Sequence, residues 1–251
     1  MVEMTLLETH GLVKRYSGRT VVNEVNVTVG QRSIVGLLGR NGAGKTTTFR
    51  MCVGMIVPEE GTVFFEGHDV TKLPMYKRAR LGMGYLSQEP SVFQRLTVRQ
   101  NLLAILETMA IGRAERKRRT ADLIDRFGLT EVANSQARVL SGGERRKLEI
   151  ARAMVTNPSL ILLDEPFSGV DPIAVEELQS EIRRLVASGV SILITDHNVE
   201  RTLEVADKAY ILDHGKVIAE GRPKEIIQNE LVRKSYLGHT FRGDEFDEEE
   251  G

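Results

Sequence analysis

The chain has 251 residues, of which 41% are hydrophobic and 27% are charged, and its formal net charge is -1. These values exclude a disordered protein, and they exclude a global positive field that would hold nucleic acid or an anionic membrane. A single cysteine excludes a disulfide framework, and because no run approaches the ~20 apolar residues that cross a bilayer, we expect no membrane span.

The first predicted element is an antiparallel hairpin over residues 4–29, which turns at Ser17 and Gly18. Its second strand carries valines at alternating positions, the pattern of a strand with one buried face. Tyr16 stands just before the turn. Its ring suits either an interface between packed elements or an exposed platform for an adenine base, and the residues alone leave both open.

Residues 33–38 form an apolar run that leads into a glycine-rich segment, and a helical stretch follows up to Gly54. The segment matches the phosphate-binding pattern G-x-x-x-x-G-K-[ST] and has the flanking strand and helix that this pattern requires. Glycines let successive N–H groups converge on phosphate oxygens, and the helix N-terminus adds partial positive charge. We expect Lys45 to reach the β- and γ-phosphates of a nucleotide and Thr46 to complete a Mg²⁺ shell. The expected phosphate-binding residues are Gly39, Asn41, Gly42, Gly44, Lys45, Thr46 and Thr47.

Two further strands are predicted at residues 62–66 and 82–86, with a short helix from Pro74 toward Arg80 between them. Gln88 follows the second of these strands directly. A polar residue at the carboxyl end of a strand in an open α/β sheet points into the ligand crevice. Gln88 is therefore a candidate for binding Mg²⁺ or the attacking water, although a loop amide with a structural role is the commoner case.

From residue 97 to residue 158 the strand pattern disappears and apolar residues recur at helical spacing, which predicts a helical insertion on the side of the core. Its basic run at residues 113–119 is better explained as a solvated helix face than as a binding patch. Near its end, Ser141 begins a capping box. The box does not explain the next two residues, Gly142 and Gly143, which suit a helix terminus that receives an anion.

Residues 160–163 are a continuous apolar run that ends in two acids, Asp164 and Glu165. Continuous apolarity marks a parallel strand buried on both faces, so both acids should lie at the edge of the sheet where nucleotide chemistry occurs. We expect Asp164 to hold Mg²⁺ through a water and Glu165 to polarise the water that attacks the γ-phosphate. An isolated acidic pair would be two solvated side chains, but a phosphate loop precedes this one.

Asp171 and the proline after it predict the start of a helix that runs to Gly189, and capping alone accounts for Asp171. A buried strand is predicted at residues 191–195. A lone histidine is more often structural than catalytic, but His197 stands just beyond the carboxyl end of that strand, where it can contact the γ-phosphate and sense its presence.

The end of the sequence predicts a hairpin over residues 209–219 and a closing helix that begins at Pro223. The last eleven residues, 241–251, are rich in acids. Such a run is typical of a disordered tail.

The order of these motifs resembles the ATP-binding cassette (ABC) ATPases over nearly all of residues 5–240. Tyr16 matches the adenine-stacking aromatic of that family, residues 39–46 match its Walker A loop, and Gln88 matches its Q-loop. Residues 140–144 match the LSGGE-type signature, and Asp164 with Glu165 match the Walker B pair. Residues 168–171 match the D-loop, and His197 matches the switch histidine. In that family two subunits pair head to tail, so each ATP lies between the Walker A of one and the signature of the other. The resemblance therefore implies a homodimer, and it assigns Ser141, Gly142, Gly143 and Asp171 to nucleotide binding.

The resemblance also implies the fold class. It is α/β, a P-loop NTPase (RecA-like) core with an N-terminal antiparallel β-subdomain and an inserted α-helical subdomain. One ABC-type domain is expected over residues 1–240. The core and β-subdomain would take about residues 1–88 and 158–240, and the helical subdomain about residues 89–157.

A narrower resemblance, to the ATPases of bacterial lipopolysaccharide exporters, rests on residues 84–89, 170–173, 194–199 and 236–242. It implies a Mg²⁺-dependent ATPase that is cytoplasmic, lies on the cytoplasmic face of the inner membrane and drives transmembrane permease subunits. Branched-chain amino acid importer ATPases are similar through much of the core and remain the alternative. A soluble ABC ATPase acting on DNA is disfavoured, because the segment between Walker A and signature has no room for coiled-coil arms.

Two departures from the family pattern are Arg40 and Ser87, which stand where proline is usual. Neither carries a catalytic role in the family. The permease is expected to dock in a groove near Gln88, Phe93 and Leu96.

Overall fold

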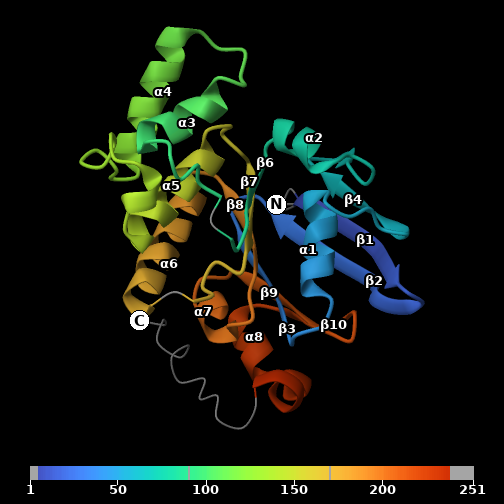
Figure 1. Ribbon diagram of the computed structural model, residues 1–251. Coiled ribbons are helices and arrows are strands. Elements are labelled where there is room, and N and C mark those ends of the chain that lie inside the picture. The colour runs from blue at the N-terminus through green and yellow to red at the C-terminus, as the bar shows by residue number, and fades with distance from the viewer. Residues whose placement is uncertain (1–4, 90, 170, 238–251) are drawn as a thin grey trace.

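The computed structural model describes residues 5–89, 91–169 and 171–237. Its strands form two sheets, and helices cover both faces of the larger one (Figure 1). The acidic tail predicted at residues 241–251 lies outside the described residues. None of the helices within the described ranges combines the length and the apolar character needed to cross a bilayer.

The smaller sheet is antiparallel and has the order β2-β1-β4-β5. Its strands are β1 (Thr5–Tyr16), β2 (Arg19–Gly30), β4 (Glu60–Phe65) and β5 (His68–Asp69). In β2, Val25, Val27 and Val29 are fully buried and alternate with exposed residues, because successive side chains point to opposite faces. The predicted hairpin is confirmed. The two-residue strand β5 was not predicted.

The larger sheet has the order β10-β9-β3-β8-β7-β6 and is parallel except for β10. Its strands are β3 (Ile34–Gly39), β6 (Met83–Leu86), β7 (Leu160–Asp164), β8 (Ser191–Thr195), β9 (Lys208–Asp213) and β10 (Lys216–Gly221). Every residue of β3, β7 and β8 is buried, which confirms the inference from their continuous apolar runs. Since these three strands are parallel neighbours, their carboxyl ends meet at one edge.

The two faces of this sheet pack against different partners. One face packs with the smaller sheet and with α1 (Lys45–Val53), which lies between the sheets. The other packs against α3 (Val98–Leu106), α5 (Gly142–Met154) and α6 (Pro172–Ala187). Alternate residues of each buried strand enter the two cores, so the phosphate-loop helix and the helical region are held on opposite sides of the sheet.

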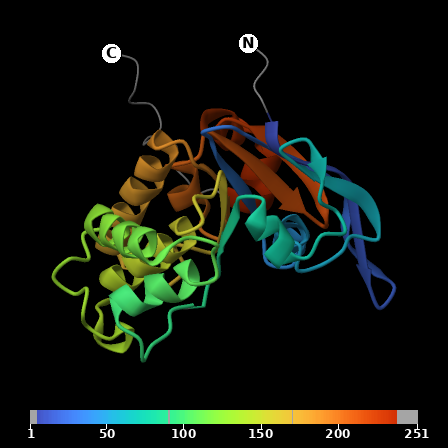
Figure 2. The ribbon, with the colours of Figure 1, turned by 90° about the horizontal axis from the view of Figure 1, so that it is seen from above.

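The remaining helices complete the covering layers. They are α2 (Met75–Arg80), α4 (Arg113–Arg126), α7 (Val199–Leu203), α8 (Pro223–Gln228) and α9 (Glu230–Val232), with a 3₁₀ turn at Ala137–Val139 and a π-helical turn at Arg233–Leu237. Seen from above, α3, α4 and α5 gather on the side away from the smaller sheet (Figure 2). The helical content predicted for residues 97–158 is confirmed, whereas the division into subdomains stays a proposal.

Two of the five basic residues in the run on α4 form ion pairs within that helix. Arg118 and Arg119 contact the Glu115 carboxylate at 2.7 and 2.8 Å, and Arg118 is 64% exposed. Pairs at this helical spacing stabilise exposed helices. The structure therefore agrees with a solvated helix face.

Candidate active site

The glycine-rich segment forms a tight loop between β3 and α1. Gly42 and Gly44 have φ of 82° and 100°, a backbone conformation that favours glycine. A Cβ on Gly44 would also lie 2.6 Å from the Val21 carbonyl oxygen, and one on Gly39 would collide with the Leu212 carbonyl. The fold of this one chain thus requires glycine at these positions.

The first turn of α1 is open to an anion. Helices α3, α5, α6 and α7 each begin with a side chain that accepts a hydrogen bond from the first turn, whereas α1 begins at Gly44 without one. Its first turn also holds no acidic residue. Unpaired N–H groups and the positive end of the helix dipole suit a phosphate group.

Lys45 lies folded back over the loop. Its Nζ donates to the carbonyl oxygens of Gly39 at 2.6 Å and Arg40 at 3.1 Å, and the residue is 6% exposed. Burial lowers the pKa of the Lys45 ammonium, while the charges of Glu165 and Asp196 oppose that change. The ammonium is therefore held in a desolvated position that faces acids, where phosphate oxygens would be strong partners.

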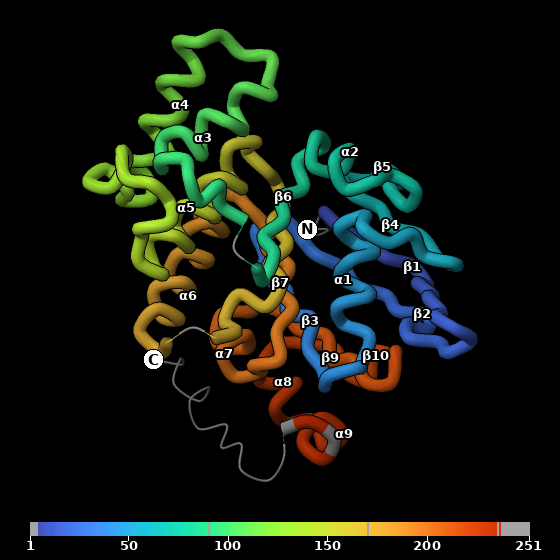
Figure 3. The backbone as a smooth tube through the Cα atoms, in the orientation of Figure 1, coloured from blue at the N-terminus to red at the C-terminus, as the bar shows by residue number. Residues whose placement is uncertain are grey.

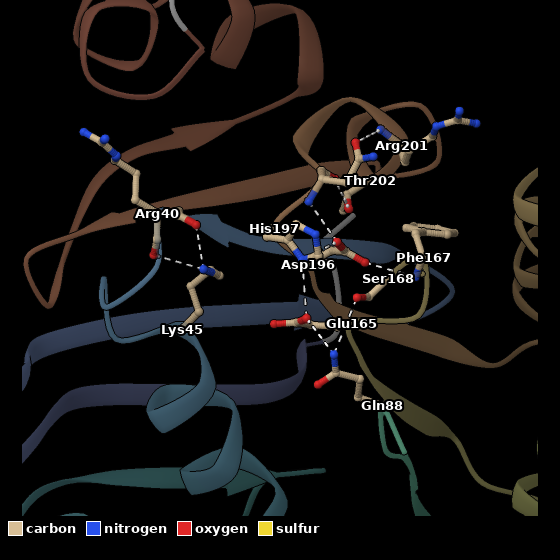
Figure 4. A network of polar contacts seen from close by, with 12 residues as sticks. Arg40, Lys45, Gln88, Glu165, Phe167, Ser168, Asp196, His197, Arg201 and Thr202 are labelled. Atoms are coloured by element: carbon tan, nitrogen blue, oxygen red, sulfur yellow. Dashed lines mark hydrogen bonds and ion pairs between the residues drawn. The ribbon is translucent and has the colours of Figure 1, made fainter. Parts of the chain in front are cut away.

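Three predicted residues meet at the carboxyl ends of β6, β7 and β8 (Figure 4). The Nε2 of Gln88 donates to Oε2 of Glu165 at 3.2 Å, and Nδ1 of His197 lies 3.3 Å from the same oxygen. Glu165 has φ of 46°, and its N–H donates to the Thr195 carbonyl at 2.7 Å. The carboxylate is thus oriented from both sides, as expected of a group that positions a water.

Asp164, the last residue of β7, is 8% exposed. Burial raises the pKa of its carboxyl, and the neighbouring charge of Glu165 adds to that rise. The Tyr85 hydroxyl, 3.4 Å away, is a weak hydrogen-bond donor to it. The charge of Arg50 opposes that rise only in part, and a divalent cation at this carboxylate would favour its ionised form further.

The donor set fits Mg²⁺ rather than a metal held by protein groups alone. Within the described residues no cluster of three or more His, Cys, Asp or Glu side chains is placed to hold a metal. Asp164 and the half-buried Thr46 offer single oxygens. Magnesium bound by one or two protein oxygens and by phosphate and water matches this supply.

Sequence reasoning missed Asp196. This residue is fully buried and accepts from the N–H groups of Phe167 at 3.1 Å and Asn198 at 2.8 Å. Its Oδ1 lies 3.5 Å from Nδ1 of His197, and burial raises the pKa of its carboxyl. Asp196 therefore ties the segment after β7 to the segment after β8. Its position directly after a buried strand is the signal that identified Asp164 and Glu165.

Tyr236 was also missed as a site residue. Its hydroxyl accepts from the N–H of Gly39, the first glycine of the loop, at 3.0 Å. Burial raises the pKa of this phenol to about 12. The two residues are 197 positions apart, and no local pattern connects them.

The capping box at the start of α5 is confirmed. Oε2 of Glu144 accepts from the Ser141 N–H at 2.8 Å, and the Ser141 hydroxyl accepts from the Glu144 N–H at 3.3 Å. The two glycines between them are different. A Cβ on Gly142 would meet nothing within 4 Å, and one on Gly143 only Oε2 of Glu177 at 3.8 Å. Nothing in the described part of this chain requires glycine there.

A cavity of about 300 Å³ joins the start of α5 to the carboxylate of Glu165. Its lining includes Gln88, Gly142, Gly143, Glu165, Ser168 and Asp171. Asp171 caps α6 by accepting from the Ala174 N–H at 3.1 Å. Lys45 and Tyr16 do not line this cavity. Tyr16 ends β1, is 45% exposed and has the Lys14 ammonium 5.6 Å from its ring centroid.

Comparisons with known proteins agree with this geometry. The family model "ABC transporter" matches residues 22–168, and the model "Branched-chain amino acid ATP-binding cassette transporter" matches residues 216–242. The lipopolysaccharide export system ATP-binding protein LptB of Acidithiobacillus ferridurans is 50% identical over 237 residues, which cover 94% of this chain and 98% of the relative. LptB of Escherichia coli (strain K12) is 48% identical over 240 residues, covering 95% and 100%.

Solved structures agree on the fold. The ADP conformation of an ATP-binding cassette of an ABC transporter superposes with a TM-score of 0.84 at 27% identity, covering 94% of this chain and 99% of that one. A subunit of a Clostridium perfringens ABC transporter complex gives 0.84 at 26% identity, covering 94% and 96%. The α/β P-loop NTPase fold is therefore confirmed. Together with the family model, which matches more than half of the chain, these likenesses establish that the chain belongs to the ATP-binding cassette family of ABC transporters.

Proposed function

We propose that this chain is the Mg²⁺-dependent ATPase subunit of an ABC transporter, converts ATP to ADP and phosphate, and drives a permease that exports lipopolysaccharide. The observation that carries the proposal is the meeting of Gln88, Glu165 and His197 at the sheet edge that also holds the uncapped phosphate loop. Binding and water activation therefore share one edge of the sheet.

Each side chain has a role in that reaction. The loop amides and Lys45 bind the phosphates, and Tyr16 offers its exposed ring to the adenine. Thr46, Asp164 and Gln88 are the groups that would hold Mg²⁺, which neutralises charge on the phosphates when bound. Glu165 accepts a proton from the attacking water, and His197 contacts the γ-phosphate. Asp196 positions His197 through its 3.5 Å contact.

The signature supports a head-to-tail homodimer. Gly142 and Gly143 begin α5 with ordinary helical φ and empty space where a Cβ would stand. Within the described residues, neither the backbone conformation nor the packing requires glycine at these two positions. A close approach by a group from outside the chain explains both glycines. A partner subunit's γ-phosphate, bound at the helix terminus beside Ser141, has the matching charge.

Mixing two inactive variants tests this arrangement. Lys45→Ala removes one half of a site and Gly142→Asp the other, so a head-to-tail mixed dimer regains one intact site. At equal amounts we expect phosphate release of about a quarter of the parent rate, because half of the dimers are mixed and half of their sites are intact.

The matched control mixes Lys45→Ala with Glu165→Gln. These residues serve the same half of the site, so no mixed dimer has an intact site and no recovery is expected. Recovery in the control, or none in the first mixture, contradicts the shared site.

A second cleft supports permease docking. It has a volume of about 200 Å³ and lies between α2, β6 and α5. Its lining includes Val53, Met75, Ala79, Tyr85, Arg152 and Thr156. The Arg152 guanidinium lies 4.6 Å from the ring centroid of Phe93, which is 49% exposed, so Phe93 stands beside the cleft. Gln88 turns instead to Glu165, and Leu96 does not line the cleft.

The cargo assignment rests on relatives. Chains named as lipopolysaccharide export ATPases match at 48–50% identity over nearly their whole length. The alternative, branched-chain amino acid import, has one observation in its favour, the C-terminal model that matches residues 216–242. Purifying the chain with its detergent-extracted partner from bacterial inner membranes separates them. We expect export-type permeases, and recovery of amino acid permeases overturns the cargo assignment.

A further inference from the structure

Arg78 is a buried cation that is not used by the proposed hydrolysis. It lies on α2, is 1% exposed, and bonds only to backbone carbonyls. Nη1 donates to Met51 at 2.8 Å and Cys52 at 2.7 Å, Nε donates to Leu73 at 2.9 Å, and Nη2 donates to Thr71 at 3.1 Å. One side chain thus fastens α2 and the segment before it to the end of α1.

The end of α1 faces this charge. Within the described residues no carboxylate forms a hydrogen bond with Arg78. Burial lowers the pKa of its guanidinium, and the charge of Asp69 opposes that change. Met51 and Cys52 belong to the last turn of α1, where the helix dipole places partial negative charge. A Cβ on Gly54, the residue that ends the helix, would lie 2.6 Å from Nε of Arg78. The Arg78 side chain thus packs directly against the end of α1.

The same short helix borders the docking cleft. Met75 and Ala79, one turn apart on α2, line the cleft together with Val53 of α1. Met75 is 39% exposed. The tube view follows the chain from α1 through β4 and β5 into α2, which returns beside α1 before β6 begins (Figure 3). α2 therefore touches the cleft on one side and α1 on the other.

We propose that Arg78 is the positioning residue through which a permease segment seated in this cleft adjusts α1, and with it Lys45 and Thr46 at the opposite end of that helix. The inference rests on the proposed function, because it needs a permease that docks there. A helix of this length moves as a rigid rod, so a displacement applied at its last turn reaches the phosphate loop at its first.

Two substitutions remove the Arg78 guanidinium, which bonds to several carbonyls at once, in different ways. Arg78→Lys keeps the charge but replaces a planar fork with a single nitrogen, which cannot span carbonyls from α1 and from the segment before α2. Arg78→Met fills a similar volume but removes the charge and every donor, so the carbonyls that Arg78 bonded lose their partner. Arg80→Met is the matched control, since Arg80 is an exposed arginine on the same helix.

The measurement is the ratio of the ATP hydrolysis rate of the assembled ATPase–permease complex to that of the free chain. We expect either Arg78 variant to lower this ratio by about tenfold, a usual size for coupling between two sites. The free-chain rate and co-elution with the permease should be kept, whereas the melting temperature should fall because buried carbonyls lose their donors. Arg80→Met should leave the ratio unchanged.

A merely structural role of Arg78 gives a different result. It would lower the free and the permease-bound rates by one factor and leave their ratio intact, and that outcome overturns the inference alone. A parent complex whose permease does not alter hydrolysis overturns the proposed coupling and the role of Arg78 together. The two failures are therefore distinguishable.

Discussion

The phosphate loop and the signature segment both place glycines where the chain leads into a helix, but for different physical reasons. At Gly39 and Gly44 a side chain would strike backbone carbonyls of the same chain. At Gly142 and Gly143 a side chain would stand in open space. The first pair is explained by the fold of one molecule, whereas in the proposed dimer the second pair is explained by a close approach from another. Glycines at a site can thus reflect either an internal contact or an external one, and the surroundings of each glycine separate the two cases.

The largest expected effect is on the rate of phosphate release, and it comes from changing Glu165, which acts on the nucleotide bound by the phosphate loop of the same chain. Glu165→Gln keeps the side chain's shape but removes the proton acceptor, so phosphate release should fall by about 10²- to 10⁴-fold. ATP binding, followed with a fluorescent nucleotide, should remain. Glu177→Gln is the control, since Glu177 lines the same cavity without contacting the sheet edge. Hydrolysis by Glu165→Gln at the parent rate would remove Glu165 from its assigned role.

The second effect tests the outward-facing half. Gly142→Asp introduces a negative charge where we expect the partner's γ-phosphate, and like charges at an interface cost several kcal/mol. Hydrolysis should fall by roughly 10²-fold or more. An acid in the first turn of a helix is favourable, so the melting temperature should not fall. A variant that is inactive because it is unfolded would contradict this explanation.

The third effect compares the phosphate loop with the signature segment by the free energy of unfolding alone. Gly44→Ala must accommodate both a positive φ and a carbonyl contact, and should lose about 2–4 kcal/mol of unfolding free energy. Gly142→Ala meets no atom and should gain up to about 1 kcal/mol, because alanine favours the helix. Urea denaturation of the two variants measures the difference. Equal losses would show that the signature glycine is also required by the single chain.

The smallest effect on stability concerns Asp164, on the metal side of the site. Because the pKa of Asp164 is raised in the folded protein, its ionisation opposes folding, and stability should fall as pH rises from its unfolded pKa through the folded one. Asp164→Asn removes this term and should raise the melting temperature of the nucleotide-free chain at neutral pH by about 2–4 °C. Mg²⁺-dependent hydrolysis should be lost. An unchanged or lower melting temperature would show that the charge is already compensated.

The parts of the site that the sequence predicted are those carried by local patterns. The run before Asp164 is apolar at every position, so it identifies a strand buried on both faces, and the following acids then lie at the ligand edge. Asp196 obeys the same rule and was missed because His197, next to it, drew the functional assignment. The capping residues Ser141 and Asp171 were found by spacing alone, and both cap their helices.

The parts that the sequence did not predict depend on long-range packing. Arg78 looks like one of several basic residues on a short helix, and only the fold shows that it is 1% exposed and bonded to α1. β5 has two residues, too few for a periodic signal. The docking groove near Gln88, Phe93 and Leu96 stays a prediction; the cleft between α2, β6 and α5 has Phe93 beside it but is lined by neither Gln88 nor Leu96.

The bond between Tyr236 and Gly39 also has a consequence for how the protein is made. The loop glycine leaves the ribosome 197 residues before its phenol partner. Because the ribosome adds about 5–20 residues per second, Tyr236 is synthesised roughly 10–40 s after Gly39. The nucleotide site is therefore completed late in translation, and synthesis that stops before residue 236 yields a cassette whose phosphate loop lacks that anchor.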